Sequence, residues 1–355
     1  MDVMIEARNL TKRYGPQRAL DNASFEVRKG EVLGFLGPNG AGKSTTMKIL
    51  TCFIAPTEGT AKINGHDIWD DPLGVRASIG YLPESTPLYT EMLVLEYLEF
   101  MAQMRGLRGD AARARIKKAV ERTHLGDVIG KEIRTLSKGY RQRVGIAQSL
   151  VHEPPILILD EPMSGLDPNQ AAEIRDLIKE IGKERTVILS THNLAEVQVT
   201  CQRVLIIAKG KIVADDTPDA LTSRGRNRYV VLVDEAAAKD AKAGYRGGAD
   251  IASAFRSVPG IETAREITSS DPKAVALELV SRSSEDLRAS IFRAAVEKGL
   301  VLLELRTRGE NLEQVFRDLT LGEDAEPNAD DEDDDDDDES GEDDEESTSD
   351  SKEKA

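Results

Sequence analysis

The sequence predicts an α/β protein with a buried, largely parallel sheet, followed by a smaller α+β unit and an acidic tail. Three observations support this fold class. Short aliphatic runs such as "EVLGFLG", "ILILD" and "TVILS" alternate with amphipathic helical stretches up to about Asp219. Such β-branched and leucine-rich runs suit parallel strands that are buried on both faces. The pattern changes after a polar stretch at residues 222–227, and the chain beyond residue 322 lacks large apolar residues.

The charge of the chain is concentrated in its last segment. The net charge is −17, but 20 acidic residues and 2 lysines from Glu323 onward give −18, which leaves 45 basic and 44 acidic residues, or +1, for residues 1–322. A nearly neutral body does not indicate a nucleic-acid-binding surface, so no nucleic acid partner is expected. Self-repulsion predicts that residues 323–355 are disordered. A solubilising role is favoured for this tail over a basic partner, and its partner stays unknown.

The cysteine and hydropathy patterns bear on location. Cys52 and Cys201 are too few for a disulfide framework, so reduced thiols are expected, with Cys52 inside a buried helix. No uninterrupted apolar run exceeds five residues, whereas a membrane-spanning helix needs about 20. The first ten residues, "MDVMIEARNL", have neither a basic start nor an apolar core of a signal peptide. We therefore expect a cytoplasmic chain without a membrane span.

The most specific motif is "GPNGAGKST", which fits G-x-x-x-x-G-K-[ST]. Its candidate ligand-binding residues are Gly37, Pro38, Asn39, Gly40, Ala41, Gly42, Lys43, Ser44 and Thr45. The glycines let backbone N–H groups turn inward around phosphates, the lysine adds a positive charge, and the serine hydroxyl can bind Mg²⁺. A strand before the motif and the helical "KSTTMKILTCF" after it disfavour an incidental glycine loop.

Two further segments supply groups for phosphate chemistry. In "PPILILDEP", an apolar strand ends in Asp160, a candidate Mg²⁺ ligand, and Glu161 follows as the candidate general base for an attacking water. In "TVILSTHN", His192 follows another strand and can contact a terminal phosphate or the water. The alternatives are a solvated pair of carboxylates and a structural histidine. Tyr14 in "LTKRYG" can stack on a base, although core packing explains it equally well.

A second anion seat is predicted at "LSKGYRQRVGIAQSL", where Ser137 and Gly139 begin a helix. Free N–H groups and the positive end of the helix dipole gather at such a start. The chain therefore carries two phosphate-type seats about a hundred residues apart.

With these elements in this order, residues 5–219 resemble the ATP-binding cassette (ABC) family, specifically the ATPase subunit of a transporter. The resemblance implies an adenine-stacking role for Tyr14, a Walker A loop from Gly37 to Thr45 and a Walker B strand ending at Asp160. It also implies that Glu161 is the catalytic glutamate, that Asp167 in "SGLD" belongs to the D-loop and that His192 is the switch histidine. ATP and Mg²⁺ are the implied cofactors.

The resemblance also explains the second seat. In this family, the signature sequence on a helical subdomain caps the γ-phosphate held by the opposite subunit, so two ATP molecules lie between two cassettes. Ser137 and Gly139 match that signature, which implies a homodimer or a dimer with a related cassette. This chain reads "LSKGY" where the family usually has LSGGQ, so Lys138 and Tyr140 are departures. Glu84 stands where the family has a glutamine, and its carboxylate can still reach Mg²⁺.

Both departures resemble those of bacterial exporter cassettes of the gliding-motility and multidrug type. The implied partner is a separate polytopic membrane permease, which would place the chain on the inner face of the cell membrane. Its coupling helix would dock in the helical subdomain that follows Glu84. The competing interpretations are a soluble cassette ATPase that acts on the ribosome or DNA, and an interaction module with a degenerate nucleotide site. The transported substrate cannot be predicted from the residues.

The expected domains are a cassette of residues 1–222, a linker at 223–227, an accessory unit of residues 228–322 and the tail of residues 323–355. In the accessory unit, strands are predicted near 229–233, 261–267, 274–280 and 300–306, and helices near 250–257, 284–298 and 310–319. The order strand-helix-strand-strand-helix-strand predicts a ferredoxin-like α+β sandwich.

Overall fold

The structure is a computed structural model. It describes residues 2–224, 227–241, 244–269, 271–282, 285–308, 316–317 and 320. The expected acidic tail, and most of the helix expected at residues 310–319, lie outside the described residues.

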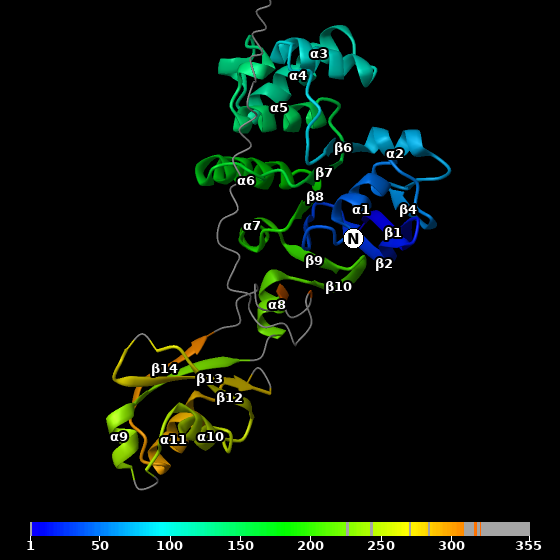
Figure 1. The fold of residues 1–355 in the computed structure, drawn as a ribbon. Helices are drawn as coiled ribbons and strands as arrows, with labels where there is room; N and C mark the ends of the chain where they lie inside the picture. Colours follow the sequence, from blue (N-terminus) through cyan, green and yellow to red (C-terminus); the bar gives the residue numbers. More distant parts are fainter. Residues whose placement is uncertain are drawn as a thin grey trace, which may run out of the picture.

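A six-stranded sheet forms the centre of the first part of the chain (Figure 1). Its strands, in spatial order, are β10 (Lys211–Asp216), β9 (Arg203–Ala208), β3 (Val32–Leu36), β8 (Thr186–Thr191), β7 (Ile156–Asp160) and β6 (Ile79–Leu82). All pairs are parallel except β10 with β9. Every residue of β3, β7 and β8 is buried, as the uninterrupted aliphatic runs predict. The predicted parallel sheet is therefore confirmed.

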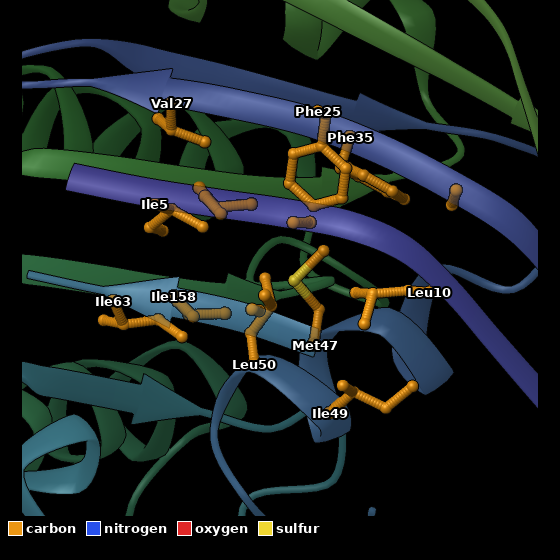
Figure 2. Close-up of a cluster of buried hydrophobic side chains, with 14 of the residues drawn as sticks. Ile5, Leu10, Phe25, Val27, Phe35, Met47, Ile49, Leu50, Ile63 and Ile158 are labelled. Carbon is orange, nitrogen blue, oxygen red and sulfur yellow. The ribbon is translucent and has the colours of Figure 1, made fainter. Parts of the chain in front are cut away.

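A second, antiparallel sheet precedes it and was not predicted from the sequence. Its strands, in spatial order, are β2 (Gln17–Arg28), β1 (Val3–Tyr14), β4 (Glu58–Ile63) and β5 (His66–Asp67). Helix α1 (Lys43–Leu50) lies between this sheet and the parallel sheet. Figure 2 shows the resulting core, in which Phe25 of β2, Met47 of α1 and Ile158 of β7 point toward one another.

The opposite face of the parallel sheet is covered by helices. These are α5 (Lys138–Leu150), α6 (Pro168–Gly182) and α7 (Leu194–Thr200), whose apolar faces pack on β3, β7, β8 and β9. Helix α5 also packs with α3 (Val94–Met104) and α4 (Gly109–Thr123) around a separate apolar cluster. This three-helix group is the predicted helical subdomain, and two short 3-10 helices at 126–128 and 133–135 connect α4 to α5. Helices α2 (Pro72–Ser78) and α8 (Pro218–Arg224) complete this part.

The later part of the chain contains its own antiparallel sheet and core. The sheet order is β12 (Ile261–Ile267), β13 (Ala274–Ser281), β11 (Arg228–Asp234) and β14 (Leu302–Arg308). Helices α10 (Gly248–Phe255) and α11 (Arg288–Glu297) pack on one face, where Tyr229, Phe255 and Leu277 are fully buried. Helix α9 (Glu235–Asp240), which the sequence did not predict, follows β11 and is capped by the Asp234 side chain.

Several local expectations need correction. Helix α1 ends at Leu50, so Cys52 is half-buried in the following turn and not within a helix. Helix α8 continues to Arg224, so the expected linker at 223–227 begins inside a helix. Phe316, which was assigned to the accessory unit, is helical but packs against the cassette core cluster that includes Leu221.

We predict that Phe35→Ala destabilises the protein by about 3–5 kcal/mol, because it leaves a cavity at a fully buried position. The ring centroid of Phe35 lies 5.6 Å from that of Phe25, so this aromatic contact is lost as well. The measurement is urea denaturation followed by fluorescence of Trp69, the only tryptophan. Phe53→Ala is the matched control, because Phe53 is 74% exposed. Equal denaturation midpoints for the two variants would contradict the assigned core.

Candidate functional site

The loop between β3 and α1 can exist only with glycine at two positions. A Cβ on Gly37 would lie 2.5 Å from the carbonyl oxygen of Ile207, which is too close for any side chain. At Gly42, φ is +113°, and a Cβ would lie 2.6 Å from the carbonyl oxygen of Ala19. Such a positive φ favours glycine. Both glycines of the motif, Gly37 and Gly42, are thus required because the loop closely approaches neighbouring backbone.

The start of α1 presents unused hydrogen-bond donors. The first N–H group of this helix to find a backbone acceptor is that of Thr46, which donates to Gly42 O at 3.0 Å. The N–H groups of Lys43, Ser44 and Thr45 have no acceptor among the described residues. Together with the positive end of the helix dipole, these donors form an anion-binding site.

Lys43 points back into this loop and is 5% exposed. Its Nζ donates to Gly37 O at 2.7 Å and to Pro38 O at 3.3 Å. The same Nζ lies 3.3 Å from Oε1 of Glu161. A buried ammonium requires a counter-charge and hydrogen-bond acceptors, and this arrangement supplies both.

Glu161 engages two candidate phosphate-binding side chains at once. It directly follows β7, is 6% exposed and has φ of +47°, which is uncommon outside glycine. Its Oε1 faces Lys43 and has no hydrogen-bond partner in the described part of the chain, while its Oε2 lies 3.0 Å from Nδ1 of His192. The structure therefore brings Lys43, Glu161 and His192 together, with the carboxylate between the two nitrogen groups.

Asp160 is the last residue of β7 and is 1% exposed. It accepts a hydrogen bond from the hydroxyl of Ser190, which the sequence analysis missed. The available signal was the serine two positions before His192, because β7 and β8 pair in parallel with Asp160 opposite Ser190. Burial, with added contributions from the charges of Asp160 and Glu84, raises the pKa of Tyr81 on β6.

The oxygen donors at this edge fit Mg²⁺. Ser44 offers a hydroxyl, and Asp160 and the exposed Glu84 offer carboxylates, which are the hard ligands that Mg²⁺ prefers. Within the described residues, no cluster of three or more His, Cys, Asp or Glu side chains could hold a metal. Mg²⁺ commonly uses one or two carboxylates together with substrate phosphates and water.

The second predicted seat lies on a different body of the chain. Ser137 caps α5, and its Oγ accepts from the N–H of Tyr140 at 3.4 Å. Gly139 is buried against α6, where a Cβ would lie 2.7 Å from Oε1 of Gln170. Helices α5 and α6 pack on the face of the parallel sheet opposite to α1, so the two seats begin helices in different layers of the chain (Figure 1).

Two other candidates have local structural roles. Asp167 caps α6, because its Oδ1 accepts from the N–H groups of Asn169 and Gln170, each at 2.9 Å. The Nζ of Lys138 lies over Gly165, where a Cβ would collide with it, so the starts of α5 and α6 are in contact. Tyr14 ends β1 and is 49% exposed, with Nζ of Lys12 at 5.3 Å from its ring centroid. Its ring is therefore not core packing and is accessible to a base.

A glycine loop between a buried parallel strand and a helix, together with a second strand of the same sheet that ends in Asp160 and is followed by Glu161, defines a P-loop NTPase. The family model described as "ABC transporter" matches residues 20–164. The daunorubicin resistance ATP-binding protein DrrA3 of Streptomyces coeruleorubidus is 33% identical over 90% of this chain and 96% of its own length. The chain belongs to the ABC transporter ATP-binding protein family, whose cassettes bind ATP.

Other relatives and solved structures agree. The probable multidrug ABC transporter ATP-binding protein YbhF of Escherichia coli is 38% identical over 64% of this chain, and the chain spans only 39% of YbhF. The structure of cbiO1 from Clostridium perfringens, part of the complex cbiONQ, is 31% identical with a TM-score of 0.58, covering 62% of this chain and 91% of cbiO1. The cassette MJ0796, solved as a dimer in a post-hydrolysis state with ADP and Pi, is 27% identical with a TM-score of 0.56, covering 60% and 98%.

We predict that Glu161→Gln increases affinity for ATP in the absence of Mg²⁺ by about fivefold, or ~1 kcal/mol. The reason is that the glutamine no longer competes with phosphate for Lys43 and His192. Equilibrium titration in EDTA measures this without hydrolysis. Glu196→Gln is the control, because this half-buried carboxylate accepts a hydrogen bond from Thr191 and makes no ion pair with Lys43. An unchanged or weaker affinity of the Glu161 variant would contradict the competition.

Proposed function

We propose that the chain is an ATP-hydrolysing subunit that dimerises around two ATP molecules and drives a separate membrane permease, in the export direction. The observation that carries the proposal is the convergence of Lys43, Glu161 and His192 on the N-terminus of α1. Membership of the ABC transporter family supports it. Relatives are named for resistance to daunorubicin and linearmycin and for bacitracin transport, which supports export.

In the proposed reaction, the N–H groups at the start of α1 and the Lys43 ammonium hold the phosphates, and Tyr14 stacks on the adenine. Phosphate binding displaces Glu161 from Lys43. The freed carboxylate accepts a proton from the water as the water oxygen bonds to the γ-phosphorus. The bond from that phosphorus to the oxygen that bridges it to ADP breaks, and ADP and phosphate are released. His192 holds the carboxylate and the terminal phosphate by hydrogen bonds, so that its orientation depends on whether that phosphate is present.

Mg²⁺ would be held by Ser44 and Asp160, with Glu84 reaching it directly or through water. When bound, the ion would neutralise charge on the β- and γ-phosphates. Glu84 adds a negative charge that the usual glutamine of the family lacks. It follows β6 and precedes α3, so it joins the nucleotide edge of the sheet to the helical subdomain.

The start of α5 would complete the partner's site. Ser137 and the N–H groups of the first turn of α5 would bind the γ-phosphate held by the other subunit. Lys138 replaces a neutral residue of the usual signature and adds positive charge there. Because α5 contacts the start of α6 through Gly139 and Lys138, closure of the dimer would also bear on Asp167. The dimeric cassette MJ0796 supports this assembly, and a related cassette could replace the second copy.

The permease is proposed as a separate polypeptide. Among the described residues, no helix is long and apolar enough to cross a bilayer. On the helical subdomain, where the permease is expected to dock, the end of α3 exposes the apolar side chain of Met104. The chain would then sit on the inner face of the cell membrane through that partner.

Copurification tests the transporter assignment directly. A tagged chain isolated from detergent-solubilised membranes is expected to retain a polytopic membrane protein in a stoichiometric complex. Recovery with ribosomes or DNA instead would overturn it.

The accessory unit is proposed as a ferredoxin-like domain within residues 228–322. The fully antiparallel order β12-β13-β11-β14, with α10 and α11 on one face, supports this topology. The proposed cassette is residues 1–222 and the proposed linker is residues 223–227, whose first two residues are the end of α8. Phe316 packs on the cassette core. The acidic residues 323–355 lie outside the described residues.

We predict that Glu161→Gln lowers kcat for ATP by about 10²–10⁴-fold, because the attacking water loses its general base. The variant is expected to accumulate as an ATP-bound dimer in the presence of Mg²⁺. Phosphate release and size-exclusion chromatography with light scattering measure the two effects. Hydrolysis at the wild-type rate would remove Glu161 from the assigned role.

We predict that the paired substitutions Ser137→Trp and Gly139→Trp abolish permease-stimulated hydrolysis, with a loss of about 10²-fold or more. A bulky residue at Gly139 collides with Gln170, and one at Ser137 blocks the start of α5. Binding of ATP to the monomer is expected to persist, because the first seat is untouched. Gly126→Trp is the control, since nothing lies within 4 Å of a Cβ there. Full stimulation of the paired variant would contradict the shared site.

A further inference from the structure

We propose that Ser190 is a positioning residue for ATP hydrolysis, which orients the Asp160 carboxylate toward Mg²⁺ and holds the Glu161 backbone in its unusual conformation. The inference rests on the proposed function. It assigns a role to a residue that the nucleotide-binding motifs do not include.

The position of Ser190 follows from the sheet register. It lies on β8, directly opposite Asp160 on the parallel strand β7, and it is fully buried. Its Oγ donates to Oδ1 of Asp160. One oxygen of this carboxylate is thereby engaged, which leaves Oδ2 for a metal ion or a metal-bound water.

Ser190 also holds the next residue of β7. The N–H of Glu161 donates to the carbonyl oxygen of Ser190 at 3.1 Å, and Oγ of Ser190 lies 3.3 Å from the same nitrogen. A hydroxyl has one proton to donate and can accept in addition. The proton is directed to Asp160, and the acceptor side of the oxygen faces the Glu161 N–H.

This contact matters because Glu161 has φ of +47°. A non-glycine residue persists in that region when its surroundings impose it. The resulting backbone direction carries the Glu161 side chain to Lys43 and His192. Since His192 lies only two positions beyond Ser190, the end of β8 supplies both the contact that fixes the Glu161 backbone and the imidazole that contacts its side chain.

The test uses Ser190→Ala, with Ser149→Ala as the matched control. Ser149 is also buried, at 1% exposure, but its hydroxyl bonds Ile146 O on α5, away from the nucleotide edge. Ser190→Ala is expected to raise the Mg²⁺ concentration for half-maximal hydrolysis about tenfold and to lower kcat. The KM for ATP, measured at saturating Mg²⁺, is expected to change little. Ser190→Thr, which retains the hydroxyl, is expected to restore most of both quantities.

An equilibrium measurement separates positioning from activity. In the Glu161→Gln background, ATP binding in EDTA is expected to be equal with and without Ser190→Ala. The gain in affinity on adding Mg²⁺ is expected to fall about fivefold in the doubly substituted chain. Ser190→Cys replaces the alanine variant if that variant does not fold, because cysteine is similar in size to serine but is a weak hydrogen-bond donor. The same fivefold fall in the affinity gain on adding Mg²⁺ is expected.

Folded Ser190→Ala or Ser190→Cys protein with the Mg²⁺ requirement of Ser149→Ala would overturn the role of Ser190 and leave the proposed function intact. A wild-type chain that neither hydrolyses ATP nor gains affinity with Mg²⁺ would overturn the proposed function and this inference together.

Discussion

The parallel hydrogen-bond register of β3, β8 and β7 is the constraint on which the rest of the structure depends. It ends three buried strands at one edge, with Leu36 opposite Thr191 and Asp160 opposite Ser190. At that edge, the glycine loop follows β3, Glu161 follows Asp160 at the end of β7, and His192 follows β8. Charged groups can be buried there because each reaches a partner that lies on, or directly follows, another strand of the sheet. A slip of register would leave those charges unpaired.

The helical layers add what the edge cannot supply alone. Helix α1 contributes N–H groups on one side of the sheet, and its buried face joins the antiparallel sheet to the core. On the other side, α5 packs both on the sheet and on α3 and α4, so it connects the helical subdomain to the nucleotide edge. The start of α5 remains exposed at Ser137. This geometry suits a seat for another molecule's phosphate better than one for the chain's own.

The parts of the fold that sequence could predict are those encoded by contiguous residues. Aliphatic runs identified the parallel strands, and the glycine motif identified the loop with its strand and helix. The antiparallel sheet was not predicted, because β1 mixes apolar and charged residues and pairs with β2 in an irregular register with several shifts. The contacts of Glu161 with Lys43 and of Ser190 with Asp160 join residues 118 and 30 positions apart. Such pairs arise from strand order, which no local pattern encodes.

The carboxylate seated against Lys43 has a consequence for selectivity in a crowded solution. A bare ammonium at a helix start would attract any small anion that diffused past. Here the place is taken by a tethered group at very high local concentration, so a lone sulfate or phosphate ion competes poorly. A nucleotide makes contacts through its base, its sugar and several phosphate oxygens at once, and can therefore displace the Glu161 carboxylate from Lys43. Without nucleotide, the chain thus selects among anions by the number of simultaneous contacts and not by charge alone.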